Sequence, residues 1–84
     1  LVCGASKGLG YACAEALAKE GAQLMLLSRS ADSLKAAADS IGRAAANQTN
    51  AQWLDCDLIE SAARKAAIDK ILNEWGSPDI IIHN

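Results

Sequence analysis

The chain has 84 residues, of which 51% are apolar and 21% charged, and its formal net charge is −2. This is the composition of a packed globular domain and not of a disordered chain. A slight negative charge without a basic run argues against nucleic acid or an anionic membrane as a partner. No apolar run approaches the roughly 18 residues that a membrane-spanning helix needs.

The three cysteines, Cys3, Cys13 and Cys56, have neither metal-ligand nor redox spacing. We interpret them as small apolar residues of a reduced, cytoplasmic protein and expect no metal site. In that setting the glycosylation sequon at residues 47–49 is a chance match. Leu1 already lies in a strand pattern and Asn84 follows one, so we expect a segment of a longer domain that is truncated at both ends.

Strand and helix patterns alternate along the chain. A short apolar segment at residues 1–3 is followed by a helix over about 9–20, whose expected buried face carries Leu9, Cys13 and Leu17. A strand at 24–27 leads to a helix at 31–41 with an apolar stripe of Leu34, Ala37, Ala38 and Ile41. A strand at 51–54, a helix at 59–75 and a strand at 80–83 complete the order. The third helix carries an apolar stripe at Ile68, Ile71, Leu72 and Trp75, and its Arg64-Lys65 pair predicts a solvated face.

This order of four strands and three helices predicts the first half of a doubly wound Rossmann-type fold, a three-layer α/β/α arrangement around a parallel sheet. Ligands of such sheets bind beyond the carboxyl ends of the strands. Polar clusters fall at those ends, at residues 4–10, 28–30, 55–57 and 83–84.

The stretch CGASKGLG, residues 3–10, joins the first strand to the first helix. Gly4 allows the chain to leave the strand sharply, Gly8 lets the main chain approach a diphosphate, and Gly10 removes a side chain where helix and strand pack. The unpaired N–H groups at the start of the helix then face the anion. The loop therefore predicts phosphate binding.

At this point the sequence resembles the short-chain dehydrogenase/reductase family. The resemblance is carried, in the family's order and spacing, by CGASKGLG at 3–10, LSRS at 27–30, DCDL at 55–58 and PDIIIHN at 78–84. Cys3 stands where the family usually has Thr, and His83 stands where it usually has the first Asn of N-N-A-G. The resemblance implies that residues 1–84 are the N-terminal part of a single NAD(P)-binding Rossmann domain.

The charges at the second strand's end favour NADP(H) over NAD(H). An NAD site needs an acid there to accept the ribose 2′-hydroxyl, and this chain has Ser28 followed by Arg29. Arg29 offers a planar fork for a 2′-phosphate, and Lys7 offers a point charge for the same group. By resemblance, the Asp57 carboxylate and the Leu58 N–H contact the adenine and Asn84 lies against the ribose. Asp57 as a cap of the third helix is an equal alternative. The predicted cofactor-binding residues are Gly4, Ser6, Lys7, Gly8, Leu9, Gly10, Ser28, Arg29, Ser30, Asp57, Leu58 and Asn84.

No catalytic residue is predicted within the chain. The family uses a Tyr-x-x-x-Lys pair and an upstream Ser, but the only tyrosine, Tyr11, is followed four residues later by Glu15. The resemblance therefore implies an NADP(H)-dependent oxidoreductase, acting between a carbonyl and a secondary alcohol, whose catalytic residues lie elsewhere. It also implies a small-molecule substrate and a homo-oligomer, a dimer or tetramer. The alternatives are a non-catalytic NADP(H)-sensing protein and a purely structural domain.

Overall fold

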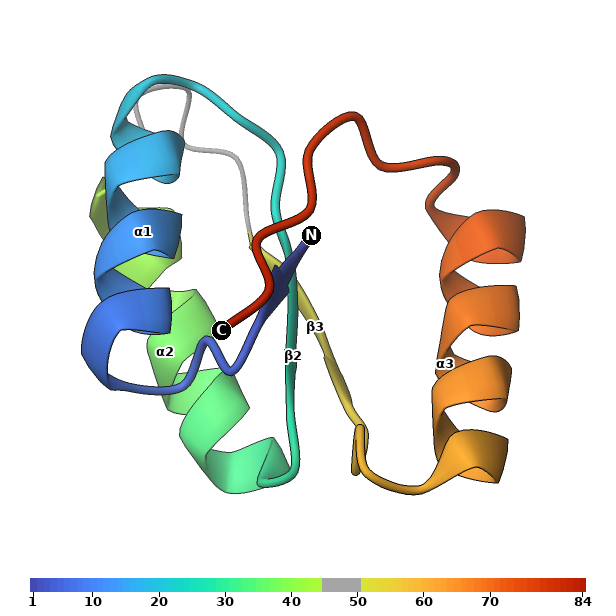
Figure 1. The fold of residues 1–84 in the computed structure, drawn as a ribbon. Helices are drawn as coiled ribbons and strands as arrows, with labels where there is room; N and C mark the ends of the chain where they lie inside the picture. The colour runs from blue at the N-terminus through green and yellow to red at the C-terminus, as the bar shows by residue number, and fades with distance from the viewer. Residues whose placement is uncertain (45–50) are drawn as a thin grey trace.

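The computed structural model describes residues 1–44 and 51–84. Strands and helices alternate along the chain, and helices α1 and α2 cover one face of the sheet while α3 covers the other (Figure 1). The expected three-layer α/β/α arrangement is confirmed. The elements are β1 (Val2–Cys3), α1 (Gly8–Lys19), β2 (Met25–Ser28), α2 (Ala31–Ala44), β3 (Gln52–Asp55) and α3 (Ser61–Glu74).

The sheet is parallel, with β2 in the middle. Val2 pairs with Leu26 on one side of β2, and Ser28 pairs with Asp55 on the other. The other edge of β1 forms a parallel bridge from Val2 to Ile82, and the Cys3 N–H donates to the Ile82 carbonyl over 2.9 Å. The spatial order is therefore β3, β2, β1 and then the segment at Ile82, so the chain changes direction across the sheet beside β1.

The expected fourth strand at residues 80–83 is present only as this single bridge at Ile82. Among the described residues, the segment has a neighbour on one side, namely β1. Ile80 and Ile81, which precede the bridge, are 58% and 60% exposed, so little apolar packing supports a longer ladder on that side of Ile82. The structure therefore has three strands and a bridge where the sequence predicts four strands.

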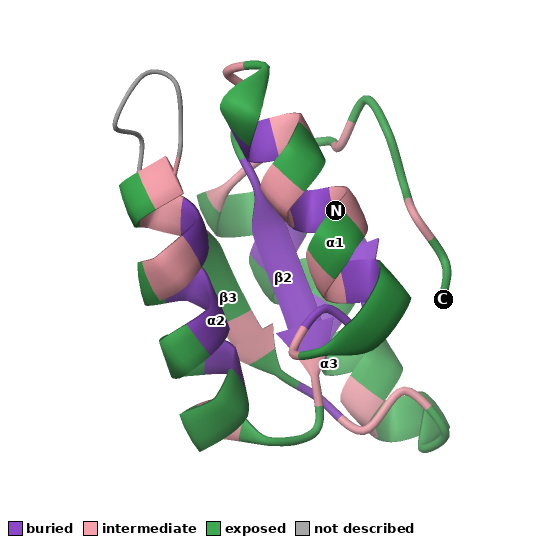
Figure 2. Ribbon diagram, turned by 90° about the vertical axis from the view of Figure 1, so that its left-hand side faces the viewer, coloured by how far each residue is buried: buried purple, intermediate pink, exposed green. Residues whose placement is uncertain are grey.

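The core consists of two clusters, one on each face of the sheet. Side chains alternate along β2, so Leu26 faces α1 and α2 with Leu34 and Ile41, whereas Leu27 faces α3 with Ile71. Figure 2 shows β2 buried except at its last residue, Ser28, and the buried stripe of α2 turned toward the sheet. The predicted apolar stripe of α2 is confirmed residue by residue.

The predicted buried face of α1 is wrong. Its buried residues are Gly10, Ala14 and Ala18, whereas Leu9 is 72% exposed. The reason is close packing, because a Cβ built on Gly10 would lie 2.3 Å from the Gly4 carbonyl oxygen. At that separation the contact face of the helix accommodates only the smallest residues, and Leu17 packs at its margin.

The predicted stripe of α3 is right only in part. Ile71 is buried with Ala67, but Ile68 and Leu72 are 50% and 48% exposed. The face of the sheet that α3 covers carries the smaller of the two core clusters. A single line of α3 side chains is therefore enough to contact the sheet. The sequon at residues 47–49 lies outside the described residues.

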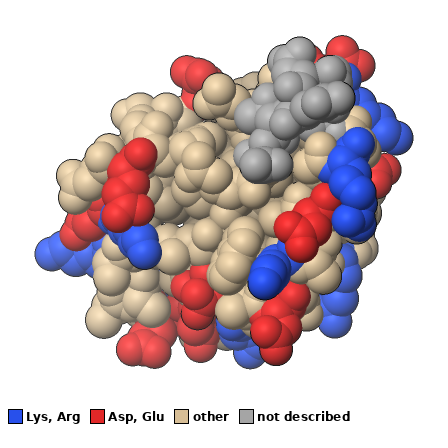
Figure 3. Space-filling view, turned by 180° about the vertical axis from the view of Figure 1, so that it is seen from behind, with Lys and Arg blue, Asp and Glu red and all other residues tan. Residues whose placement is uncertain are grey.

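Charged side chains are dispersed over the face of the molecule that Figure 3 shows. Figure 3 shows acidic and basic residues interspersed around a broad uncharged area, and no side of that view gathers one sign. Within the two described ranges, none of the helices has the length and apolar character needed to cross a bilayer.

The two glycines at the start of α1 are expected to respond differently to alanine. Gly8 has φ 64° with open space around it, so Gly8→Ala should cost about 1 kcal/mol of backbone strain. Gly10→Ala places its Cβ against a backbone oxygen, and overpacking of that kind costs about 1–3 kcal/mol. Urea unfolding of the full-length protein should show the larger loss for Gly10→Ala, and the reverse order would contradict the close packing.

Candidate functional site

The glycine loop is attached to the end of β2. The Gly4 and Ala5 N–H groups both donate to the Leu27 carbonyl, over 2.8 and 3.3 Å. Gly4 has φ 67°, a left-handed conformation that side chains disfavour. The chain therefore turns over the carboxyl edge of the sheet immediately after β1, where the strand order reverses.

The first turn of α1 has an unbalanced positive field. Lys7 is its N-cap and makes no side-chain cap bond, and the turn contains no acidic residue. The first N–H groups of a helix have no partner within it, so they attract an anion. In α2, by contrast, the Ser30 hydroxyl accepts from the Ser33 N–H over 3.3 Å and Asp32 lies in the first turn.

An open hollow of about 510 Å³ lies between the glycine loop and the end of β2. Ser6 and Ser28 face each other in it, with their hydroxyl oxygens 3.3 Å apart. One of these hydroxyls donates to the other, which leaves one proton of the pair for a ligand. The lining residues are Ser6, Lys7, Ser28, Arg29, Ser30 and Ser33.

This hollow therefore combines two cations with four hydroxyls and includes no acid in its lining. Asp55, which follows the strand predicted at residues 51–54, is the last residue of β3 and the register partner of Ser28, but it does not line the hollow. Sequence reasoning missed Ser33. The sequence feature that could have identified Ser33 is its spacing of three residues from Ser30, because residues three apart lie on the same side of a helix.

Asp57 forms a local turn after β3. Its Oδ1 accepts from the Ile59 N–H over 3.1 Å, whereas α3 begins at Ser61 with Glu60 as its N-cap. Asp57 therefore does not cap α3, which removes the alternative raised by the sequence. Leu58 is partly buried against the cluster under α3.

Asn84 reaches back to the glycine loop. Its Nδ2 donates to the Gly4 carbonyl over 3.3 Å and would lie 3.0 Å from a Cβ on Gly10. The segment after Ile82 thus contacts both glycines of the turn. Tyr11, the tyrosine without a lysine four residues later, is partly buried against the core.

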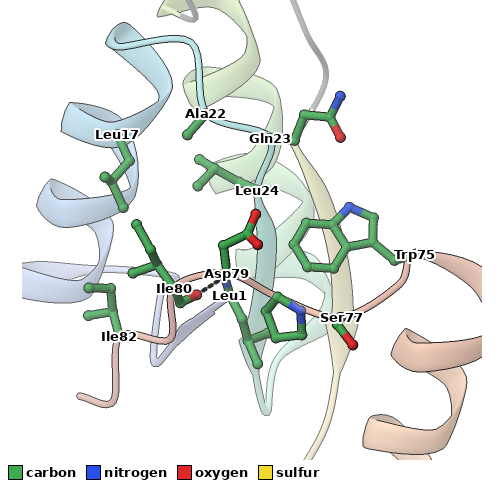
Figure 4. Close-up of a pocket in the computed structure, with 11 residues that line it drawn as sticks. Leu1, Leu17, Ala22, Gln23, Leu24, Trp75, Ser77, Asp79, Ile80 and Ile82 are labelled. Atoms are coloured by element: carbon green, nitrogen blue, oxygen red, sulfur yellow. Dashed lines mark hydrogen bonds between the residues drawn. The ribbon is translucent and has the colours of Figure 1, made fainter.

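A second hollow, of about 320 Å³, opens at the amino ends of the strands (Figure 4). Leu17, Leu24, Trp75 and Ile80 turn their apolar side chains toward it, with Asp79 as its single acid. Because it contains none of the predicted site residues and lies at the other edge of the sheet, the hollow at Lys7 and Arg29 is the candidate site. Among the described residues no group of three His, Cys, Asp or Glu could hold a metal ion.

Two thiols are buried near the site. Burial raises the pKa of Cys3, and the thiol of Cys56 further along the chain adds to the shift. Burial also raises the pKa of Cys56, followed by the charges of Asp57 and Asp55. Both residues are free thiols, and a raised pKa keeps them protonated and weakly nucleophilic.

The parallel sheet, the helices on both faces and the glycine loop beside the switch point define an α/β protein of the doubly wound class. The family model for short chain dehydrogenases matches residues 1–84. The chain therefore belongs to the short-chain dehydrogenase/reductase family, a family of oxidoreductases.

Similar proteins come from bacteria and an archaeon. The 3-oxoacyl-acyl-carrier-protein reductase FabG of Escherichia coli K12 is 33% identical over 84 residues, which are 100% of this chain and 32% of that protein. The L-sorbose reductase of Gluconobacter frateurii, solved with NADPH and L-sorbose, is 30% identical with a TM-score of 0.89 over 99% of this chain and 31% of its own. The Thermococcus sibiricus alcohol dehydrogenase, solved with 5-hydroxy-NADP, is 30% identical with a TM-score of 0.84 over 95% of this chain and 33% of its own. The chain spans about a third of each.

The buried thiols predict a loss of stability at alkaline pH. Their pKa values are higher in the folded than in the unfolded protein, where a thiol titrates near pH ~8.5. Their stabilisation is therefore complete below that pH and is lost as the pH rises through the folded pKa values. The free energy of unfolding of the full-length protein can be measured in urea between about pH 7 and 10 under reducing conditions. As the pH rises, this free energy should fall less steeply for a Cys3→Ala, Cys56→Ala double variant than for wild type. Equal slopes would contradict this origin.

Proposed function

We propose that the chain forms the NADP(H)-binding N-terminal part of a Rossmann domain in a short-chain dehydrogenase/reductase that moves a hydride between nicotinamide and a carbonyl or secondary alcohol. The observation that carries the proposal is the hollow at the end of β2, where Lys7 and Arg29 meet four serines without an acid. A phosphate dianion needs that combination of charge and hydroxyl donors.

The predicted site residues can be grouped by the part of the cofactor that each group would bind. The turn of Gly4, Gly8 and Gly10, with the amides at Leu9, would receive the diphosphate at the start of α1. Ser6, Lys7, Ser28, Arg29 and Ser30 would bind the 2′-phosphate. Asp57 and Leu58 would contact the adenine, and Asn84 would lie against the ribose.

The cofactor supplies the hydride, and this chain's residues bind and orient it. Two solved relatives support NADP(H), since one holds NADPH and the other 5-hydroxy-NADP. The proton donor, the substrate pocket and the surfaces of a dimer or tetramer are proposed to lie outside these 84 residues. Three free cysteines agree with a reduced, cytoplasmic setting.

Arg29→Asp tests the choice of NADP(H). Hydrogen bonds to charged groups are worth about 1.5–3 kcal/mol and the new carboxylate repels a phosphate, so NADPH should bind about 100-fold more weakly while NADH is retained or improved. Arg43→Asp is the matched control, because Arg43 lies in the last turn of α2, where it contacts Ser40, and makes the same change of charge. If the ratio of NADPH to NADH affinity stayed the same in Arg29→Asp, the proposal would fail.

A second measurement separates an enzyme from an NADP(H)-sensing protein. The family's chemistry needs a Ser and a Tyr-x-x-x-Lys pair, which the full-length sequence should contain. NADPH oxidation by the full-length protein should then depend on an added carbonyl compound and be lost when that Tyr becomes Phe. NADPH binding without turnover, together with the absence of the pair, would favour the sensor.

A further inference from the structure

We propose that Arg64 is a positioning residue that holds the loop after β3 in the shape required to bind adenine. This inference rests on the proposed function, because it concerns the adenine end of the same cofactor. The sequence predicts Arg64 and Lys65 as a solvated face of the third helix. Both residues are exposed, as predicted, but the Arg64 guanidinium also folds back from the first turn of α3 onto the loop.

Arg64 makes two hydrogen bonds to the loop. Its Nη1 donates to the Leu58 carbonyl over 2.6 Å and to the Ile59 carbonyl over 3.1 Å. The backbone of Arg64 is itself fixed, since its N–H donates to the Glu60 carbonyl over 3.0 Å. One side chain therefore ties two consecutive carbonyls of the loop to the helix.

Together with bonds made by Asp57 and Glu60, the Arg64 bonds fix successive peptide planes of the loop. The plane between Leu58 and Ile59 is held at both ends, by Arg64 at the carbonyl and by Asp57 Oδ1 at the N–H. The plane between Asp57 and Leu58 is held because the Asp57 carbonyl accepts from the Glu60 N–H over 3.1 Å. The hydrogen bonds that hold the loop against α3 are therefore all made by Asp57, Glu60 and Arg64.

The bond from the Glu60 N–H to the Asp57 carbonyl orients the peptide next to the one that Arg64 holds, and it directs the Leu58 N–H away from the helix. In a trans peptide the carbonyl and the N–H point in opposite directions, so the Leu58 N–H points away from the Glu60 N–H that binds the Asp57 carbonyl. The Leu58 N–H donates to no described residue. Asp57 uses Oδ1 within the loop, which leaves Oδ2 as an acceptor. One donor and one acceptor side by side match the ring nitrogen and the exocyclic amine of adenine.

Charge gives Arg64 a second effect on the same loop. The carboxylates of Asp55, Asp57 and Glu60 act together on the nearby Cys56 thiol, and Arg64 is the cation that opposes them there. Arg64 therefore offsets part of the negative charge in this loop. Arg64 is exposed, so both effects are moderated by water, and we expect changes of a few-fold to tenfold.

The test compares NADPH with its hypoxanthine analogue, which has an oxygen in place of the exocyclic amine and a proton on the facing ring nitrogen. Affinities are measured by titration for the full-length wild type and for Arg64→Ala, Arg64→Lys and Lys65→Ala. Wild type should prefer NADPH by about 5- to 10-fold. Arg64→Ala should reduce that preference to less than about 2-fold, and Arg64→Lys, which keeps the charge and one donor, should restore part of it.

Lys65→Ala is the matched control, because it removes the adjacent exposed cation and should retain the wild-type preference. A thermal midpoint measured for each variant separates adenine recognition from unfolding. An Arg64→Ala protein that kept the full preference, with or without an equal loss of affinity for both cofactors, would overturn the inference. A wild type that bound NADPH without any preference would overturn it as well, but would leave the proposed function standing. A wild type that bound no NADPH would overturn both.

Discussion

The close contact between α1 and the end of β1 is the constraint on which the site depends. A Cβ at Gly10 would lie 2.3 Å from the Gly4 carbonyl oxygen, and the same oxygen accepts a hydrogen bond from Asn84. The start of α1 and the distant end of the chain at Asn84 therefore meet at one backbone group of the glycine loop. This contact brings the amino end of α1 to the carboxyl edge of the sheet, at the place where the chain reverses direction beside β1.

The strand order then arranges the loops in a line. Parallel strands lie about 4.8 Å apart, so the loops after β1, β2 and β3 occupy successive positions along one edge. The loop after β1 leads into the amides of α1, the loop after β2 carries Arg29, and the loop after β3 carries Asp57. An elongated ligand lying across this edge meets an anion site first, then a cationic hollow and then a paired donor and acceptor. This order of groups along the edge agrees with the proposed dinucleotide site.

Sequence reasoning succeeded where side-chain size and periodicity agree. In α2 the large apolar residues Leu34 and Ile41 are the buried ones, so the pattern identifies the face. In α1 the contact is too close for large residues, and the longest apolar side chain, Leu9, lies outside. The glycine loop and the ends of β2 and β3 could be predicted because strand ends mark the edge of the sheet. Ser33 was missed although its spacing from Ser30 places it on the same side of the helix, and Arg64 could not be predicted because it reaches the loop by a side-chain contact that composition does not encode.

The N-cap of α1 is the place where local preference is least satisfied. Ser, Thr, Asp and Asn at this position stabilise a helix by about 1 kcal/mol, whereas Lys7 makes no cap bond and adds a positive charge to the positive end of the dipole. The neighbouring helix α2 has both a serine cap and an acid in its first turn, so the same chain provides the comparison. Local rules are most often broken where a ligand compensates for the loss. A bound phosphate would satisfy both the unpaired amides of α1 and Lys7. The start of α2 is already capped by Ser30, so Arg29, which precedes that cap, is not needed there and lines the hollow instead.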